Sequence, residues 1–162
     1  MSAIEQRLTE LGLALPPPMQ PPPGAVLPFP WVRIVGDRAF VSGHGPVGPD
    51  GSLAKPLGKV GVEVTEAQGY AAARLTGLAI LSSLQQALGN LDRIDAWLRV
   101  FGMVNAAPGF NRFPAVINGF SDLILEVFGG EAGAHARSAV GMAGLPFDIP
   151  VEIEAELLIR SP

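Results

Sequence analysis

The sequence has 162 residues, 48% apolar and 16% charged, a balance that predicts one folded domain rather than a disordered chain. The net charge of −4 and the pI near 5.1 oppose the approach of phosphate backbones, so no nucleic acid partner is expected. The absence of cysteine excludes disulfides, thiolate nucleophiles and cysteine-ligated metal sites.

The first residues also bear on location. Glu5, Arg7 and Glu10 stand where a secretory signal would be apolar, so we expect a cytoplasmic protein. The longest apolar stretch, residues 71–84, is interrupted by Arg74 and is too short to span a bilayer, so no membrane partner is expected. A mean hydropathy of +0.34 is high for a small soluble chain and predicts that further copies cover part of its surface.

The N-terminal segment combines a short helix with a proline-rich connector. Residues 2–11 are predicted to be helical, with Ser2 and Glu5 forming a capping box. Proline runs at 16–18 and 21–23 can continue neither a helix nor a strand ladder. We interpret them as a stiff strap across the surface rather than as a ligand for a signalling domain. Residues 1–26 are therefore set apart from a main domain at 27–162.

Two strands are predicted next, at 31–35 and 38–42, with a turn at Gly36-Asp37. Residues 43–48 then match the letters of a GxGxxG phosphate loop. Such a loop binds a dinucleotide only where its last glycine opens a helix, and here a Pro-Asp-Gly turn follows at 49–51. We therefore expect a loop without a phosphate role.

The main helix is predicted from its cap at Thr65 to Leu88, with a stop at Gly89-Asn90. Small residues on its core face are expected to let it lie close against a sheet. This face is predicted to carry Ala67, Ala71, Leu75, Leu78, Ala79 and Ser82.

A strand at 95–101, a helix at 113–128 and two strands at 137–142 and 151–159 complete the predicted elements. Strict alternation in the first of these strands would place Ala96, Leu98 and Val100 on one face and Trp97, Arg99 and Phe101 on the other. Trp97 and Phe101 are interpreted as core or subunit contacts rather than as a base-stacking platform. The order of elements predicts a single α+β domain.

The last strand alternates strictly, with Glu152, Glu154 and Glu156 on one face. Three neighbouring carboxylates repel one another, so at least one is expected to have a cationic partner or a chemical task. Arg137, on the preceding strand, is the predicted partner.

This segment resembles the Rid family, also called the YjgF or L-PSP endoribonuclease family. The signature of that family is an A-R-S triplet, an L-P pair and an I/V-E-I-E-A strand, which this sequence carries at 136–138, 145–146 and 151–155. The opening strands add to the match, because residues 35–37 and 40–43 resemble its V-G-N and F-x-S-G. The resemblance spans about residues 27–159 and looks like a longer-chain branch of the family.

The resemblance implies a chorismate-mutase-like fold, in which a mixed sheet is backed by two helices. It also implies a homotrimer around an inner barrel, with active sites between neighbouring subunits. The implied reaction is the hydrolysis of reactive 2-imino acids to 2-keto acids and ammonia, without a cofactor or a metal.

The resemblance also assigns roles to four residues. Arg137 matches the arginine that holds the substrate carboxylate, and a guanidinium fork can grip both oxygens. Glu152 matches the glutamate that positions the attacking water. Gly43 matches a glycine that lines the cleft, and Asn118 matches a polar helix residue near the site.

Two substrate-binding positions depart from the family pattern and keep other functions open. Phe29 stands where many members have tyrosine, and Ala139 stands where many have cysteine. A trimer that binds 2-keto acids without turnover is therefore the alternative. An endoribonuclease or a chorismate mutase is less favoured, because neither a basic patch nor several clustered cations are present. Arg137 could also serve only in a structural ion pair.

His44 and His135 are too few and too far apart in the sequence to predict a metal site. Local hydrogen bonding is the interpretation we favour for both. His135 stands two residues before Arg137, so it could add positive potential near the site at low pH.

Overall fold

The computed structural model describes residues 2–21 and 23–160. Two short 3-10 turns, Leu91–Arg93 and Pro146–Asp148, join the main elements. These elements are α1 (Ala3–Glu10), β1 (Val32–Val35), β2 (Arg38–His44), α2 (Glu66–Leu88), β3 (Ile94–Asn105), α3 (Phe113–Ala132), β4 (Ala136–Met142) and β5 (Val151–Ile159). Every predicted helix and strand is present, and the predicted caps at Ser2 and Thr65 are confirmed, each as a full capping box.

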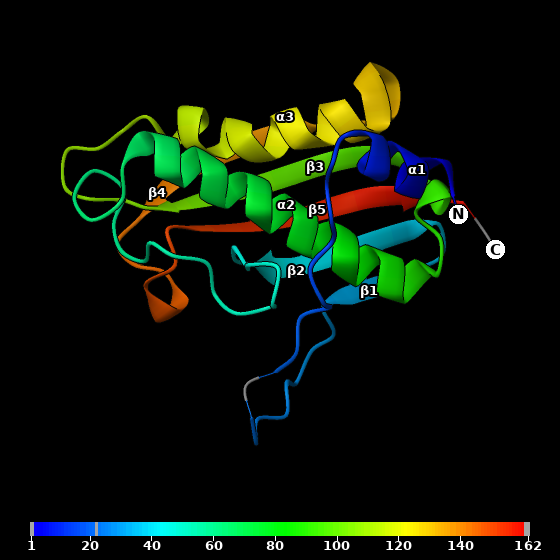
Figure 1. Ribbon diagram of the computed structural model, residues 1–162, viewed down its shortest axis with the longest axis horizontal. Helices are drawn as coiled ribbons and strands as arrows, with labels where there is room; N and C mark the ends of the chain where they lie inside the picture. The colour runs from blue at the N-terminus through cyan, green and yellow to red at the C-terminus, as the bar shows by residue number, and fades with distance from the viewer. Residues whose placement is uncertain (1, 22, 161–162) are drawn as a thin grey trace.

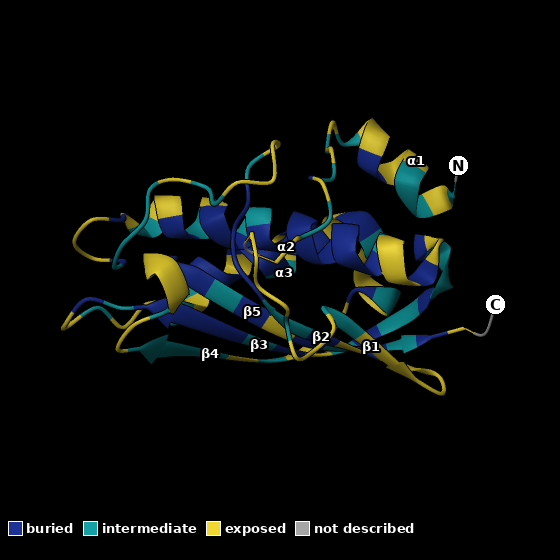
Figure 2. Ribbon diagram, turned by 90° about the horizontal axis from the view of Figure 1, so that it is seen from below, coloured by how far each residue is buried: buried dark blue, intermediate teal, exposed yellow. Residues whose placement is uncertain are grey.

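The strands form one sheet in the order β1-β2-β5-β3-β4 (Figure 1). Neighbouring strands are antiparallel except β3 and β4, which run parallel. Helices α2 and α3 cover one face, and the opposite face, called the open face below, has no helix over it (Figure 2). The predicted α+β class, with a mixed sheet backed by two helices, is confirmed.

Helices α2 and α3 approach each other closely because small residues lie between them. A Cβ on Gly77 would lie 2.6 Å from Leu123 of α3, and a Cβ on Gly119 would collide with the Tyr70 carbonyl. The predicted core face of α2 is wrong in part, because Ala67 and Ala71 are exposed. The small residues serve the contact with α3 rather than the contact with the sheet.

The predicted alternation of β3 is also wrong in part. Trp97 and Val100 are both buried in the core, although they lie three residues apart, because the pairing of β3 with β5 shifts between Trp97 and Arg99. A bulge of this kind adds one residue to a strand and reverses the faces beyond it. The interpretation of Trp97 as a core residue is confirmed.

The N-terminal segment packs on the same core. Leu8 of α1 is buried, and the amides of Ala3 and Ile4 donate to the carboxylate of Asp92. The connector then crosses α2, where Ser82 Oγ donates to the Pro16 carbonyl at 2.7 Å (Figure 1). Among residues 2–21 and 23–160, no helix combines the length and apolarity needed to cross a membrane.

Candidate functional site

Arg137 lies on the edge strand β4, and its side chain points to the helix-covered side of the sheet. Its pairing partner Val100 is a buried core residue, and directly paired residues share a face. Nη1 of Arg137 donates to Asn118 Oδ1 at 2.9 Å and to Ser121 Oγ at 3.1 Å, and Nη2 donates to the Pro114 carbonyl at 3.4 Å. The structure thus brings together two predicted site residues, Arg137 and Asn118.

The same cluster continues to a histidine. Ser121 Oγ lies 2.9 Å from Nε2 of His135, and Nδ1 of His135 lies 2.7 Å from the Gly133 carbonyl. A pocket of about 320 Å³ adjoins the cluster, and its lining consists of Ser121, Leu125, Ala134, His135 and Arg137. Ser121 is not among the site residues predicted from the sequence. Ser121 follows Asn118 by three residues on a predicted helix, and this spacing places the two side chains on the same face.

The charge of Arg137 has no carboxylate partner within the part of the chain that the structure describes. Among residues 2–21 and 23–160, the ion pairs involve other arginines. Burial lowers the pKa of Arg137, and the more distant Asp122 acts in the opposite direction. A partly buried guanidinium without a carboxylate partner is well suited to bind an external anion.

Glu152 lies on β5 with its side chain on the open face, opposite Met103 of β3. Its carboxylate folds over Gly43 of β2, where a Cβ would collide with Glu152 Oε1. Burial raises the pKa of Glu152, and the nearby Glu154 raises it further. No hydrogen bond or ion pair from the described residues reaches this carboxylate. Gly43 and Glu152, both predicted site residues, therefore form a second cluster.

The two clusters do not meet within one chain. Strand β3 separates β4 from β5, which sets the two strands about 10 Å apart. Arg137 faces the helices and Glu152 faces the open side. The predicted pairing of Arg137 with the glutamates is therefore not formed within one chain, because strands that follow each other in sequence are not neighbours in this sheet. Glu156 lies instead 3.9 Å from Arg38.

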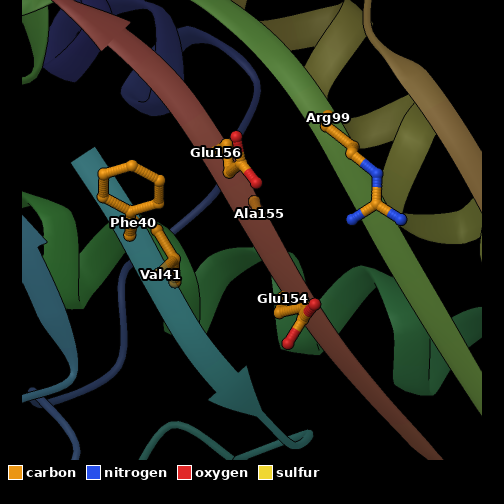
Figure 3. A pocket seen from close by; sticks show the side chains of 6 residues that line it. All are labelled: Phe40, Val41, Arg99, Glu154, Ala155 and Glu156. Atoms are coloured by element: carbon orange, nitrogen blue, oxygen red, sulfur yellow. The ribbon is translucent and has the colours of Figure 1, made fainter. Parts of the chain in front are cut away.

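The glutamates share the open face with a different cation. Figure 3 shows Glu154 and Glu156 projecting from β5 beside Arg99 of β3 and Phe40 of β2. These side chains surround a hollow of about 150 Å³. The guanidinium of Arg99 also lies 5.7 Å from the ring of Phe101. Arg99, which pairs in register with Glu156, is thus a cation on the same face as the glutamates.

Comparison with known proteins agrees with this architecture. A family model described as YjgF/chorismate mutase-like, putative endoribonuclease, matches residues 5–151. The chain belongs to this family. Protein TCP17 of Trypanosoma cruzi is 40% identical over 154 residues, covering 94% of this chain and 91% of that protein.

Two solved structures of YjgF-like architecture extend the comparison. The structure of Atu1372 from Agrobacterium tumefaciens is 40% identical, with a TM-score of 0.84 and coverage of 96% of this chain and 91% of that one. The structure of E. coli TdcF with bound serine is 24% identical, with a TM-score of 0.58 and coverage of 86% and 93%. At that identity, TdcF shows a shared fold alone.

Ala139 and Phe29 are the remaining positions carried over from the YjgF resemblance. Ala139 lies two residues after Arg137 on the same face of β4 and packs against the core. Phe29 is 46% exposed, and its ring stacks edge-on against Trp31, 5.8 Å away. Trp31 in turn contacts His44, the neighbour of Gly43. Because the ring of His44 faces α2 through Ser83, these ring contacts place Phe29 beside neither Glu152 nor Arg137.

His44 is a fully buried structural residue. Its Nδ1 donates to the Ser42 carbonyl at 2.6 Å, and its Nε2 lies 2.9 Å from Ser83 Oγ. Across the described residues, no group of three His, Cys, Asp or Glu could hold a metal. Residues 49–65 contain turns and isolated bridges, so the predicted turn at 49–51 is confirmed and no helix begins where a dinucleotide loop would need one.

Proposed function

We propose that this protein hydrolyses small 2-imino acids to 2-keto acids and ammonia. The observation that carries the proposal is the state of Arg137. Its Nη1 is anchored on α3, and its charge has no carboxylate partner among the described residues. A guanidinium held in this way can grip the carboxylate of a ligand through its other nitrogens.

Glu152 supplies the acid–base group of the proposed reaction. The carboxylate takes a proton from water as the oxygen adds to the imine carbon, and the imine nitrogen gains a proton. In the carbinolamine the hydroxyl then gives its proton, by way of Glu152, to the amine nitrogen. The C–N bond breaks, ammonia leaves, and the hydroxyl oxygen becomes the keto oxygen. Burial raises the pKa of Glu152, which makes its carboxylate a stronger base than an exposed glutamate.

The proposed site requires more than one copy of the chain. Arg137 and Glu152 lie on opposite faces of the sheet and on strands separated by β3. The open face also exposes apolar side chains, with Val35 52% and Phe40 37% exposed. We propose a homotrimer in which these faces enclose an inner barrel and the Arg137 cluster of one copy meets the Glu152 cluster of the next.

A second candidate function is the binding of small carboxylates without turnover. Phe29 offers no hydroxyl to a ligand, and Ala139 offers no thiol. TdcF, a protein of the same fold, was crystallised with serine, which is itself a small carboxylate. Stabilisation of the fold by pyruvate, without any imine hydrolysis, would favour this candidate.

Ribonuclease action, which the description of the family names, is less favoured for this chain. The net charge of −4 opposes the approach of RNA, and Arg99 on the open face lies beside Glu154 and Glu156. RNA cleavage that survives repurification and disappears in a Glu152→Gln variant would instead favour it.

The direct test generates 2-iminopropionate with an amino-acid oxidase and traps it with semicarbazide. Wild-type protein is expected to suppress semicarbazone formation. Arg137→Ala is expected to lower kcat/KM about 100-fold, and Glu152→Gln by about 10²–10⁴-fold. Arg160→Ala is the control, because Arg160 is an exposed arginine that pairs with Asp95 and lies eight residues beyond Glu152, after the end of β5. No suppression by wild-type protein, with small or bulky imines, would overturn the deaminase function.

A further inference from the structure

A serine–histidine pair stands behind the guanidinium of Arg137. The Gly133 carbonyl can only accept a hydrogen bond, so Nδ1 of His135, 2.7 Å away, carries the hydrogen. The neutral ring then offers a lone pair at Nε2. Ser121 Oγ lies 2.9 Å from that nitrogen, so the serine hydroxyl donates to it. The direction of the serine hydroxyl is thereby fixed by the tautomer of His135.

This direction decides how Ser121 meets Arg137. With its hydrogen given to His135, Ser121 Oγ presents lone pairs to Nη1 of Arg137 at 3.1 Å, and Asn118 Oδ1 accepts from the same nitrogen at 2.9 Å. Both Nη1 hydrogens are therefore used. Nη2 gives one hydrogen to the Pro114 carbonyl, while Nε and the second Nη2 hydrogen find no acceptor among the described residues.

The pocket beside this network has room for a small ligand. Its volume is about 320 Å³, and three of its lining residues are Ser121, His135 and Arg137. Leu125, which is 41% exposed, forms an apolar wall. A carboxylate of a few carbons fits this combination of an anchored guanidinium, a hydroxyl and an apolar side chain.

We propose that Ser121 and His135 are positioning residues, which hold Arg137 so that its Nε and Nη2 hydrogens face the carboxylate of the ligand. Neutral His135 orients Ser121, and Ser121 fixes Nη1. The class of ligand rests on the proposed deaminase function. The positioning itself rests on the hydrogen bonds around Arg137 and can be tested without that function.

The charges around His135 agree with its role as an acceptor. Burial lowers the pKa of His135, and Arg137 on β4 lowers it further. On α3, Asp122 acts on Arg137 and accepts a hydrogen bond from Tyr70 of α2, while Glu126 pairs with Arg74. A bound carboxylate would offset the charge of Arg137 and so raise the pKa of His135.

The test compares two serines that bond to histidines in the same way. Ser121→Ala is expected to weaken pyruvate binding about tenfold, and to raise KM for the imine by a similar factor with much less change in kcat, because the clamp acts on bound and reacting states alike. Ser83→Ala, which removes the matching bond to His44, is expected to leave pyruvate affinity unchanged. Ser121→Thr keeps the hydroxyl and His135→Gln keeps an acceptor, so both are expected to retain binding. His135→Leu keeps no acceptor and is expected to weaken binding by no more than Ser121→Ala does.

NMR of the Arg137 guanidinium and the His135 ring supplies a readout that does not depend on turnover. Resolved Nη signals in wild-type protein should average in Ser121→Ala, and pyruvate should raise the pKa of His135. Unchanged Nη signals together with unchanged pyruvate affinity in Ser121→Ala would overturn the proposal. If wild-type protein neither binds pyruvate nor hydrolyses an imine, the deaminase function fails by itself. In that case averaged Nη signals in the variant support the positioning, and unchanged signals overturn it.

Discussion

Two histidines of this chain are held by the same local arrangement. In each, Nδ1 donates to the carbonyl two residues earlier, Ser42 for His44 and Gly133 for His135. In each, Nε2 lies 2.9 Å from the hydroxyl of a helix serine. The geometry of the pair alone does not distinguish a structural histidine from one that serves a site.

The surroundings make the difference. His44 is fully buried under Trp31, and the hydrogen-bonded chain ends at Ser83 inside the core. His135 is half-buried, and its chain continues through Ser121 to a guanidinium beside a pocket. In the core, a histidine–serine hydrogen bond gives two buried polar groups the partners they need. At the edge of the sheet, the same hydrogen bond can orient a charged side chain.

The largest expected effect that separates the two pairs is a loss of stability in acid caused by His44. Burial lowers the pKa of His44 from 6.5 to about 4, so between these values the unfolded chain binds more protons than the folded one. The free energy of unfolding should therefore fall as pH drops through this window, by about 3 kcal/mol in all, and stay constant above it. Urea unfolding of the wild-type protein from pH 4 to pH 7.5 measures the effect.

His44→Gln provides the control for this measurement, because glutamine does not titrate and can still accept from Ser83. The variant should be less stable at pH 7 but should lose much less stability on acidification. The same pH dependence in both proteins would contradict the assignment of the effect to His44. His135→Gln should differ far less from wild-type, since His135 is only half-buried.

A smaller effect should separate the two serines. Ser83→Ala leaves Nε2 of buried His44 without a partner and should lower the free energy of unfolding by about 1–2 kcal/mol. Ser121→Ala should cost less than about 1 kcal/mol, because water can reach the partly exposed His135. Urea midpoints at one fixed protein concentration measure both losses. Equal losses of stability would mean that the Ser83–His44 and Ser121–His135 pairs are equally important to the fold, which would contradict the difference drawn between them.

The sequence predicted those parts of the fold that depend on local chemistry. The capping boxes at Ser2 and Thr65 marked helix starts, and the alternation around Glu152 marked the last strand and its faces. The faces of β3 and α2 were not predictable in the same way. A bulge near Trp97 shifts the faces of the strand, and α2 is buried by the sheet and by α3 together, which spreads its buried residues around the helix.

In the candidate site, too, local patterns were predictable from the sequence and contacts made by tertiary packing were not. Arg137 and Glu152 were identified by resemblance to a family, and their expected contact depended on β4 and β5 being neighbours. Strand order is set by long-range packing, which no local pattern encodes. Ser121 was missed because a serine on a helix surface is common, and its role arises only from its contacts with His135 and Arg137.

The smallest expected effect concerns Glu152, a titratable group whose carboxylate has neither a hydrogen-bond partner nor a counter-ion among the described residues. Its pKa is raised by burial and by Glu154, so the folded chain binds the proton more tightly than the unfolded chain does. Ionised Glu152 should therefore cost stability as pH rises through the raised pKa. Glu152→Gln should increase the free energy of unfolding at pH 7, by less than about 1 kcal/mol because the group is partly exposed.

The pH dependence of this gain distinguishes it from a packing effect. The difference in urea midpoint between Glu152→Gln and wild-type protein should vanish below pH 4.5, the ordinary range of a glutamate, and grow above it. This is the opposite direction to the effect of His44, so the two groups can be told apart in one series of measurements. If Glu152→Gln gains stability at pH 7 and loses imine hydrolysis, then Glu152, like His135, serves the ligand site at some cost to stability. If the variant loses stability instead, then Glu152, like His44, stabilises the fold.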